Sequence, residues 1–131
     1  MNRPASSPAR SRLDLLDPFE VSKLGGLEVV TEGVVDYCAR RGIGFLAYSP
    51  TGGGRLNRKL PDHPVLQPMA ARLRTTPHAL VLAWVLARSP TVIVIPSART
   101  VAHAQNAASA AEIALSEADL GAITAAEFSR A

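Results

Sequence analysis

Apolar positions along the chain form two short runs and several sets with helical spacing. The runs at 43–48 and 91–95 end at turn residues, and the second run is almost entirely β-branched. Short apolar runs of this kind are typical of buried strands. Apolar residues spaced three and four apart predict helices, with the following bounds: 28–41, 64–73, 76–88, 100–109 and 116–126. The glycine-rich, basic stretch 51–62 predicts a loop.

Helix ends carry recognisable signals. Gly42 is placed to end the first helix in a left-handed conformation. Thr76 followed by Pro77 predicts a capped helix start, and Ser116 with Asp119 resembles a capping box in which Asp replaces the usual Glu or Gln. A set of apolar residues is expected on the inward face of the first helix: Val30, Val34, Tyr37 and Cys38. Trp84 is expected in the core.

Helices alternate with the two strands, which predicts parallel β/α units. Two parallel strands do not make a stable sheet, because both faces and both edges need cover. The chain has 131 residues, whereas a complete β/α barrel needs about 250. The sequence therefore predicts part of a larger sheet. Residues 1–12 are polar and proline-containing and are expected to be disordered, and residues 13–27 have no assignable pattern.

Composition excludes several classes of function. The net charge is +3, but the arginines are scattered and only 5% of residues are aromatic, so nucleic-acid binding is unsupported. One cysteine excludes an internal disulfide, and neither His63 nor His78 has a partner at metal-ligand spacing. No apolar run approaches membrane-spanning length. A cytoplasmic protein without membrane or metal is the expectation.

The end of the first strand is one candidate binding element. Parallel β/α folds bind ligands at the carboxyl ends of their strands. Tyr48 lies there and could stack on a flat ligand, while Ser49 and the backbone amides near Gly52 could hold a pyrophosphate. The alternative is an ordinary strand end followed by a flexible loop.

The end of the second strand is the other candidate. Pro96 through Arg99 follow it, and a helix begins directly afterwards. A phosphate there would meet a guanidinium and free N–H groups of the helix start. His103 and Asn106 lie three apart on that helix, so both could face the same ligand. The alternatives are a surface arginine and a solvated helix face. His78 is expected to be structural or exposed.

Four segments together resemble the aldo-keto reductases, in the order that this family has them. The segments are Gly42–Pro50 with Gly52–Gly54 and Leu56, Thr76–Pro77 with Leu82–Ala87, Ile95–Arg99 with His103 and Asn106, and Leu115–Leu120. The resemblance runs from about Val29 to the C-terminus. It implies that residues 28–131 are the cofactor-binding, C-terminal half of a (β/α)8 TIM barrel, incomplete as a stand-alone chain.

The resemblance also implies a function, namely NADP-dependent reduction of small-molecule carbonyl compounds. By analogy Tyr48 stacks on the nicotinamide. The pyrophosphate is lined by Ser49, Pro50 and Gly52, and the 2′-phosphate of the adenosine ribose is held by Ser97, Ala98 and Arg99. His103 and Asn106 approach the adenosine end. Thr51 departs from the family pattern, which has leucine there.

The catalytic residues of the family belong to the first half of its barrel, and nothing before residue 28 resembles those segments. No catalytic residue is assigned, and the isolated chain is expected to be inactive. The alternatives are a non-enzymatic half-barrel that binds nucleotide or self-associates through open sheet edges, and a non-functional gene fragment.

Overall fold

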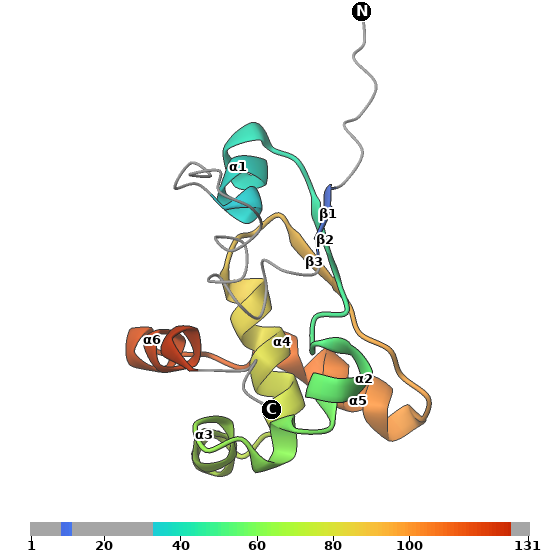
Figure 1. Ribbon diagram of the computed structural model, residues 1–131, viewed down its shortest axis with the longest axis vertical. Coiled ribbons are helices and arrows are strands. Elements are labelled where there is room, and N and C mark those ends of the chain that lie inside the picture. The colour runs from blue at the N-terminus through green and yellow to red at the C-terminus, as the bar shows by residue number, and fades with distance from the viewer. Residues whose placement is uncertain (1–8, 12–32, 127–131) are drawn as a thin grey trace, which may run out of the picture.

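The computed structural model describes residues 9–11 and 33–126 and contains a three-stranded parallel sheet. Strand β2 (Phe45–Tyr48) is central, with β1 (Ala9–Ser11) on one side and β3 (Val92–Ile95) on the other. The pairing of β2 with β3 opposes Phe45 to Val92 and Tyr48 to Ile95. The predicted parallel arrangement of the two apolar strands is therefore confirmed (Figure 1).

Strand β1 corrects the prediction of disorder for residues 1–12. Ala9–Ser11 pair in parallel with Phe45–Ala47. A central strand has two edges, and the second edge of β2 offers N–H and C=O groups that need partners. A short extended segment can satisfy them through its backbone alone, whatever its side chains are. Hydrophobic patterning cannot detect such a strand. The rest of the predicted tail, residues 1–8 and 12, and the unassigned stretch 13–27 lie outside the described residues.

Five helices lie within the predicted ranges. Their bounds are α1 (Val34–Arg41), α3 (Leu66–Leu73), α4 (Pro77–Ala87), α5 (Val101–Ser109) and α6 (Glu117–Ala125). The prediction of a continuous loop over 51–62 is wrong, because this stretch contains α2 (Gly53–Asn57) and the 3-10 turn η2 (Leu60–Asp62). Such short elements have no measurable periodicity, and glycine lowers helix propensity. A further 3-10 turn, η3 (Ala110–Glu112), follows α5.

The predicted helix ends are confirmed in detail. Gly42 adopts φ 62°, and the N–H of Ile43 donates to the carbonyl of Cys38 at 2.8 Å, which closes α1 in a left-handed C-cap. The Thr76 side chain accepts from the N–H of Ala79, with Pro77 in the first turn of α4. At the start of α6, Ser116 and Asp119 form the reciprocal capping box.

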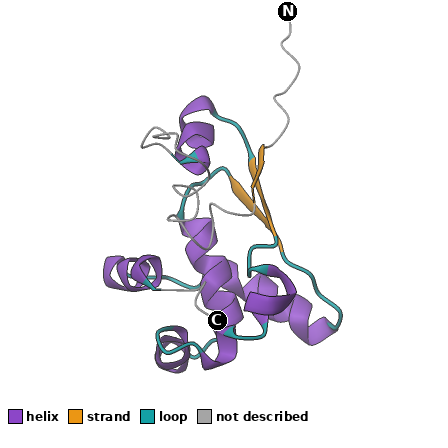
Figure 2. Ribbon diagram, in the orientation of Figure 1, coloured by secondary structure: helices purple, strands orange, loops and turns teal. Residues whose placement is uncertain are grey.

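Helix α4 is the centre of the hydrophobic core and covers one face of the sheet together with α1 (Figures 1 and 2). Its residues 79 to 85 are all buried, Trp84 among them. The Trp84 indole N–H also donates to the Thr124 hydroxyl at 3.1 Å, which ties α4 to α6. None of the described helices is long and apolar enough to cross a membrane.

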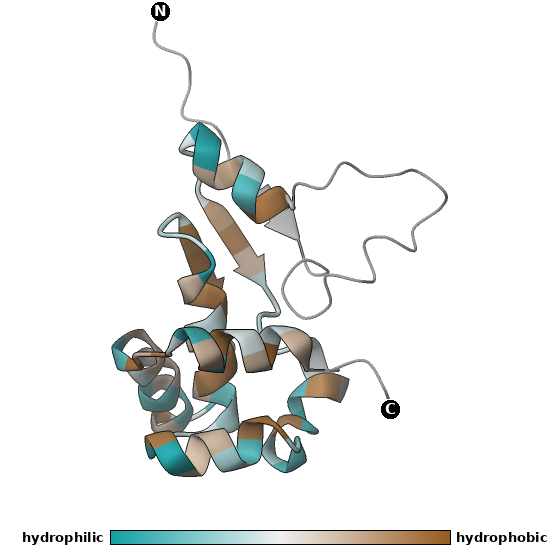
Figure 3. Cartoon of the chain, turned by 90° about the vertical axis from the view of Figure 1, so that its left-hand side faces the viewer, coloured by the Kyte–Doolittle hydropathy of each residue, from teal (hydrophilic) through white to brown (hydrophobic). Residues whose placement is uncertain are grey.

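The sheet has one covered and one exposed face. Phe45, Ala47 and Val92 are buried on the helix side. Ile93 and Ile95 are 53% and 46% exposed on the opposite side, although the apolar run predicted burial of both faces. Strand side chains alternate between faces, and helices among the described residues cover only one of them. Figure 3 shows the apolar character of the strands.

The inward face of α1 also differs from the prediction. Val35 and Cys38 are buried, whereas Val34 and Tyr37 are exposed. Val30 lies outside the described residues. The Arg41 guanidinium lies 5.4 Å from the centre of the Tyr37 ring, so the tyrosine packs against a charged neighbour at the surface. Val35 is buried where Val34 was predicted to be, and Cys38 is the only residue common to the predicted and the observed buried face of α1.

Asp119 connects α6 to α3. Its carboxylate accepts hydrogen bonds from the hydroxyl and the backbone N–H of Ser116, at 2.7 and 3.1 Å, and pairs with the Arg72 guanidinium. These donors favour the charged form, so the pKa of Asp119 lies below its ordinary value of 3.8, with the Ser116 hydroxyl as the main cause. Burial opposes this shift without reversing it.

The lowered pKa predicts a loss of stability in acid. The Asp119 contribution is fully present above the unfolded-state pKa and disappears as the pH falls through the lower folded-state pKa. Asp119→Asn removes the charge and should make the unfolding free energy less dependent on pH below about 4. Urea unfolding at pH 7 and at pH 3 tests this. Equal pH dependence in the wild-type chain and the variant would contradict it.

Candidate functional site

The turns that follow β2 and β3 leave the sheet at the same edge. The two strands are parallel neighbours, and their last residues, Tyr48 and Ile95, are register partners. The segments 49–52 and 96–99 therefore begin side by side. Figure 1 shows both strands leading to the end of the molecule where α2 and α5 lie. The sequence placed both candidate turns after strands, and the register brings them to one edge.

The first turn has an unusual backbone. Ser49 has φ 50°, Gly52 has φ 82° and Gly53 has φ 70°. A left-handed conformation is strained for serine and accessible to glycine. The N–H of Gly52 donates to the carbonyl of Ser49 at 2.9 Å, which closes a four-residue turn. The Pro50 side chain is buried, so Pro50 shapes the turn and its ring does not line an open surface.

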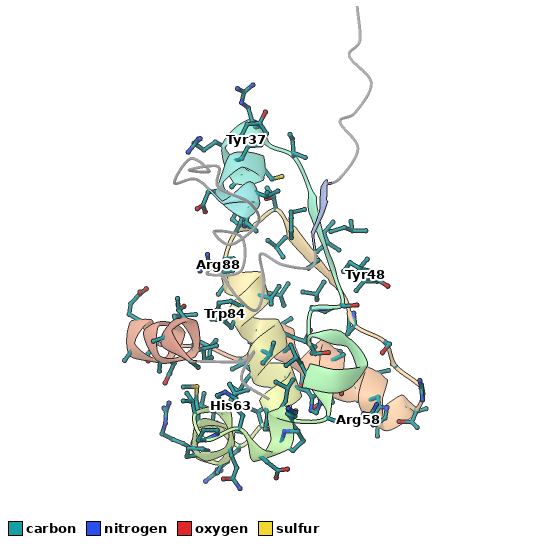
Figure 4. The ribbon with its side chains drawn as sticks, viewed as in Figure 1. Tyr37, Tyr48, Arg58, His63, Trp84 and Arg88 are labelled. Atoms are coloured by element: carbon teal, nitrogen blue, oxygen red, sulfur yellow. The ribbon has the colours of Figure 1, made fainter. Side chains whose placement is uncertain are left out.

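Tyr48 is the exposed aromatic group beside this turn. It is 57% exposed at the end of β2, whereas Phe45 in the same strand is fully buried. Figure 4 shows its ring on the side of the sheet away from α4. The exposed side chains of its neighbours on this face, Ile93 and Ile95, make the surroundings apolar. An exposed aromatic ring on an apolar surface is suited to stack against a flat ligand.

The second turn presents a cation. Ser97, Ala98 and Arg99 are all exposed. Thr100 caps α5, because its hydroxyl accepts from the N–H of His103 at 3.1 Å. Arg99 therefore stands next to the N-terminus of a nine-residue helix, where a guanidinium and helix N–H groups can act on the same anion.

His103 and Asn106 occupy different environments on α5. The His103 side chain is exposed. Asn106 is half-buried, and its side-chain oxygen accepts a hydrogen bond from the Thr76 hydroxyl at 2.8 Å. Asn106 therefore joins α5 to the cap of α4, so its carbonyl oxygen is already engaged. Its amide group remains the part that could donate to a ligand.

A series of hydrogen bonds behind the first turn was not predicted from the sequence. Asn57 donates to the Thr51 hydroxyl at 2.7 Å, and His78 Nε2 lies 3.0 Å from the backbone and side-chain oxygens of Asn57. The expectation that His78 is structural or exposed holds, because it is half-buried and linked to Asn57. The partners are separated by 6 and 21 positions, so no local sequence pattern reveals them.

His63 has a local role as well. Its Nδ1 lies 3.2 Å from the backbone nitrogen of Val65 and accepts from the start of α3. Within residues 9–11 and 33–126, no three His, Cys, Asp or Glu side chains are grouped so that they could hold a metal ion. The candidate binding groups where β2 and β3 end are therefore the aromatic ring of Tyr48, side-chain hydroxyl groups and the guanidinium of Arg99.

Comparison with protein families and curated proteins gives a consistent result. The sequence model of the Aldo/keto reductase family matches residues 21–127. Pyridoxine 4-dehydrogenase of Escherichia coli is 34% identical over 86 residues, which cover 66% of this chain and 29% of that protein. Methylglyoxal reductase YeaE of the same organism is 33% identical over 125 residues, covering 84% of this chain and 44% of its own.

Solved structures give the same result at the level of the fold. A thermostable aldo-keto reductase in complex with the inhibitor epalrestat has a TM-score of 0.59 at 29% identity, over 70% of this chain and 32% of that chain. Aldose reductase from Giardia lamblia has a TM-score of 0.59 at 31% identity, over 69% and 31%. The chain spans less than half the length of the curated relatives reported above. By sequence and by fold, this chain belongs to the aldo/keto reductase family.

Proposed function

We propose that residues 28–131 are the cofactor-binding, C-terminal half of a (β/α)8 barrel that interconverts carbonyl compounds and alcohols with NADP. Family membership supports an oxidoreductase function. The names of the two Escherichia coli relatives, a pyridoxine dehydrogenase and a methylglyoxal reductase, both describe reactions of this type on small molecules. The substrate of this chain is accordingly a small carbonyl compound.

The observation that carries the proposal is the register of β2 and β3. It sets an exposed aromatic ring, Tyr48, and an exposed guanidinium, Arg99, on turns that start from one sheet edge. A dinucleotide phosphate has a flat ring at one end and a 2′-phosphate at the other, so these two groups match its two ends. Ser49 and Gly52 between them line the pyrophosphate, and Pro50 fixes the shape of their turn.

The adenosine end lies over α5 in this proposal. Ser97 and Ala98 lead the chain to Arg99, which pairs with the 2′-phosphate beside the helix N-terminus. His103 and Asn106 follow on α5 and face the adenosine. When bound, NADPH would supply the hydride, and these residues would hold it in place. The choice of NADP over NAD depends mainly on Arg99.

Arg99→Ala should weaken the binding of NADP⁺ by about 12- to 150-fold, because a hydrogen bond between charged groups contributes about 1.5–3 kcal/mol. The affinity for NAD⁺, which lacks the 2′-phosphate, should change little. Isothermal titration of the full chain with both dinucleotides measures the two effects. Arg41→Ala is the matched control. It removes the same charge near the start of β2, at the amino ends of the strands and away from the candidate site.

Two results would contradict this assignment. Equal affinities of the wild-type chain and Arg99→Ala for NADP⁺ would remove the phosphate role of Arg99. Equal losses for NADP⁺ and NAD⁺ would show that the substitution acts through the fold of the turn and not through the 2′-phosphate.

A second candidate function is a non-enzymatic half-barrel that binds nucleotide and associates with another copy. One observation favours it: the uncovered face of the sheet exposes Tyr48, Ile93 and Ile95 together. Apolar surface of this kind is covered in most stable proteins. Both candidates share the dinucleotide site and differ in whether that site serves a catalytic barrel or a self-associating, non-catalytic half-barrel.

A further inference from the structure

Two backbone positions in the turn after β2 cannot donate to a phosphate. Pro50 has no N–H group, and the N–H of Gly52 already donates to the carbonyl of Ser49. Glycine-rich turns usually hold phosphates through such backbone N–H groups. In this turn, side-chain hydroxyl groups are the additional source of donors. Ser49 provides one, and the half-buried Thr51 provides the other.

The orientation of the Thr51 hydroxyl follows from the bonds behind it. His78 Nε2 lies 3.0 Å from the backbone oxygen of Asn57, which can only accept, so Nε2 must carry the proton. The same nitrogen lies 3.0 Å from the side-chain atom Oδ1 of Asn57. That contact fixes the amide with its oxygen toward His78 and its nitrogen toward Thr51.

The Thr51 oxygen is therefore an acceptor in this chain of bonds. Asn57 Nδ2 donates to it at 2.7 Å. The hydroxyl hydrogen of Thr51 then remains to be donated, and no described residue accepts it. A hydroxyl that accepts one hydrogen bond becomes a better donor of another, because bonds in a chain polarise one another.

The chain of bonds also gives the turn a rigid support. Three residues between 49 and 53 have positive φ, and glycine loses more backbone entropy on ordering than other residues. His78 stands in the first turn of α4, which is the most deeply buried helix of the described part. The bond from His78 to Asn57 therefore connects the turn to the core.

We propose that the Thr51 hydroxyl donates a hydrogen bond to the pyrophosphate of the bound dinucleotide, and that Asn57 and His78 position it. Thr51 is a binding residue in this account, and Asn57 and His78 are positioning residues that act through it. The proposal rests on the proposed function, because the pyrophosphate belongs to the same site. It gives the threonine at this position, where the family pattern has leucine, a specific task.

Thr51→Val tests the hydroxyl directly, because valine keeps the shape and removes the donor. It should weaken NADP⁺ binding about tenfold, while Thr51→Ser, which keeps a hydroxyl, should stay within about threefold of the wild-type chain. Adenosine 2′-monophosphate lacks both phosphate groups of the pyrophosphate, so its affinity should be the same for all three chains. Isothermal titration provides each value, and circular dichroism shows that each chain is folded.

A double-mutant cycle tests the positioning role. His78→Leu should weaken NADP⁺ binding in the wild-type background and have almost no effect in the Thr51→Val background, because its action passes through the hydroxyl. His78→Gln, which keeps an N–H donor at similar reach, should restore most of the affinity. A purely structural role of His78 would lower the affinity equally in both backgrounds.

The outcomes separate this inference from the proposed function. If the wild-type chain binds NADP⁺ and Thr51→Val binds it equally well, the hydroxyl has no role and the inference is wrong while the proposed function stands. If additive effects appear in the cycle, the positioning role is wrong. If the wild-type chain binds neither NADP⁺ nor adenosine 2′-monophosphate, the proposed function fails, and the inference fails with it.

Discussion

Phe45→Ala is expected to remove most of the stability of the fold, whereas Tyr48→Ala is expected to weaken cofactor binding and leave the fold intact. Both substitutions truncate an aromatic ring in β2. Phe45 is fully buried in the core cluster that also contains Leu80 and Trp84, and Tyr48 is 57% exposed. The same chemical change should therefore have opposite consequences at the two ends of a four-residue strand.

The magnitudes follow from burial and stacking. Truncating a buried Phe to Ala costs about 3–5 kcal/mol, which is comparable to the whole stability of many small domains. Removing an exposed ring costs little, because it makes few core contacts. Stacking of a flat heterocycle on an aromatic side chain contributes about 1–3 kcal/mol, so Tyr48→Ala should weaken NADP⁺ binding about 5- to 150-fold.

Urea unfolding and NADP⁺ titration of the two variants measure the contrast. Each variant is the control for the other, because both replace an aromatic residue of β2 by alanine and only the position in the strand differs. A Tyr48→Ala chain that unfolds as readily as Phe45→Ala would show that the exposed face is covered in solution. Unchanged NADP⁺ affinity in a folded Tyr48→Ala chain would contradict the stacking role.

The purified 131-residue chain is expected not to oxidise NADPH in the presence of a generic aldehyde. Hydride transfer to a carbonyl requires a proton donor. The resemblance implies that the catalytic residues belong to the first half of the barrel, and the 131-residue sequence contains no segment that resembles that half. The sequence contains only two tyrosines. Tyr48 is assigned to stacking, and Tyr37 lies on α1 beside Arg41, before the start of β2 and away from the strand ends.

Absorbance of NADPH at fixed aldehyde concentration measures the rate, and Escherichia coli methylglyoxal reductase is a suitable positive control. Turnover by the chain at ordinary enzyme rates would contradict the assignment of catalysis to other segments. Absent turnover with intact NADP⁺ binding is common to both candidate functions. A mass above that of one chain in size-exclusion chromatography would then favour the self-associating half-barrel.

Local signals in the sequence predicted much of the fold. The positions of β2 and β3 and the caps at Gly42, Thr76 and Ser116 follow from apolar runs and capping chemistry that act over a few residues. The parallel order follows from the alternation of strands and helices. Because parallel strands end at a common edge, the sequence also predicted the two turns that make the candidate site.

Features that depend on distant contacts were not predictable from local patterns. Strand β1 forms through backbone pairing with β2, and its residues Ala9–Ser11 give no strand pattern. Burial of only one face of β3 depends on which helices pack nearby, which the apolar run does not encode. The bonds of Asn57 to Thr51 and His78, and of Thr76 to Asn106, join residues on separate elements.

The central claim is that the turns after β2 and β3 hold one dinucleotide together, and an NMR titration of the isotopically labelled full chain with NADP⁺ tests it most directly. The account predicts that amide signals of residues 49–54 and of residues 97–99 shift together and fit a single dissociation constant. Shifts confined to one of these turns, or different constants for the two, would contradict it.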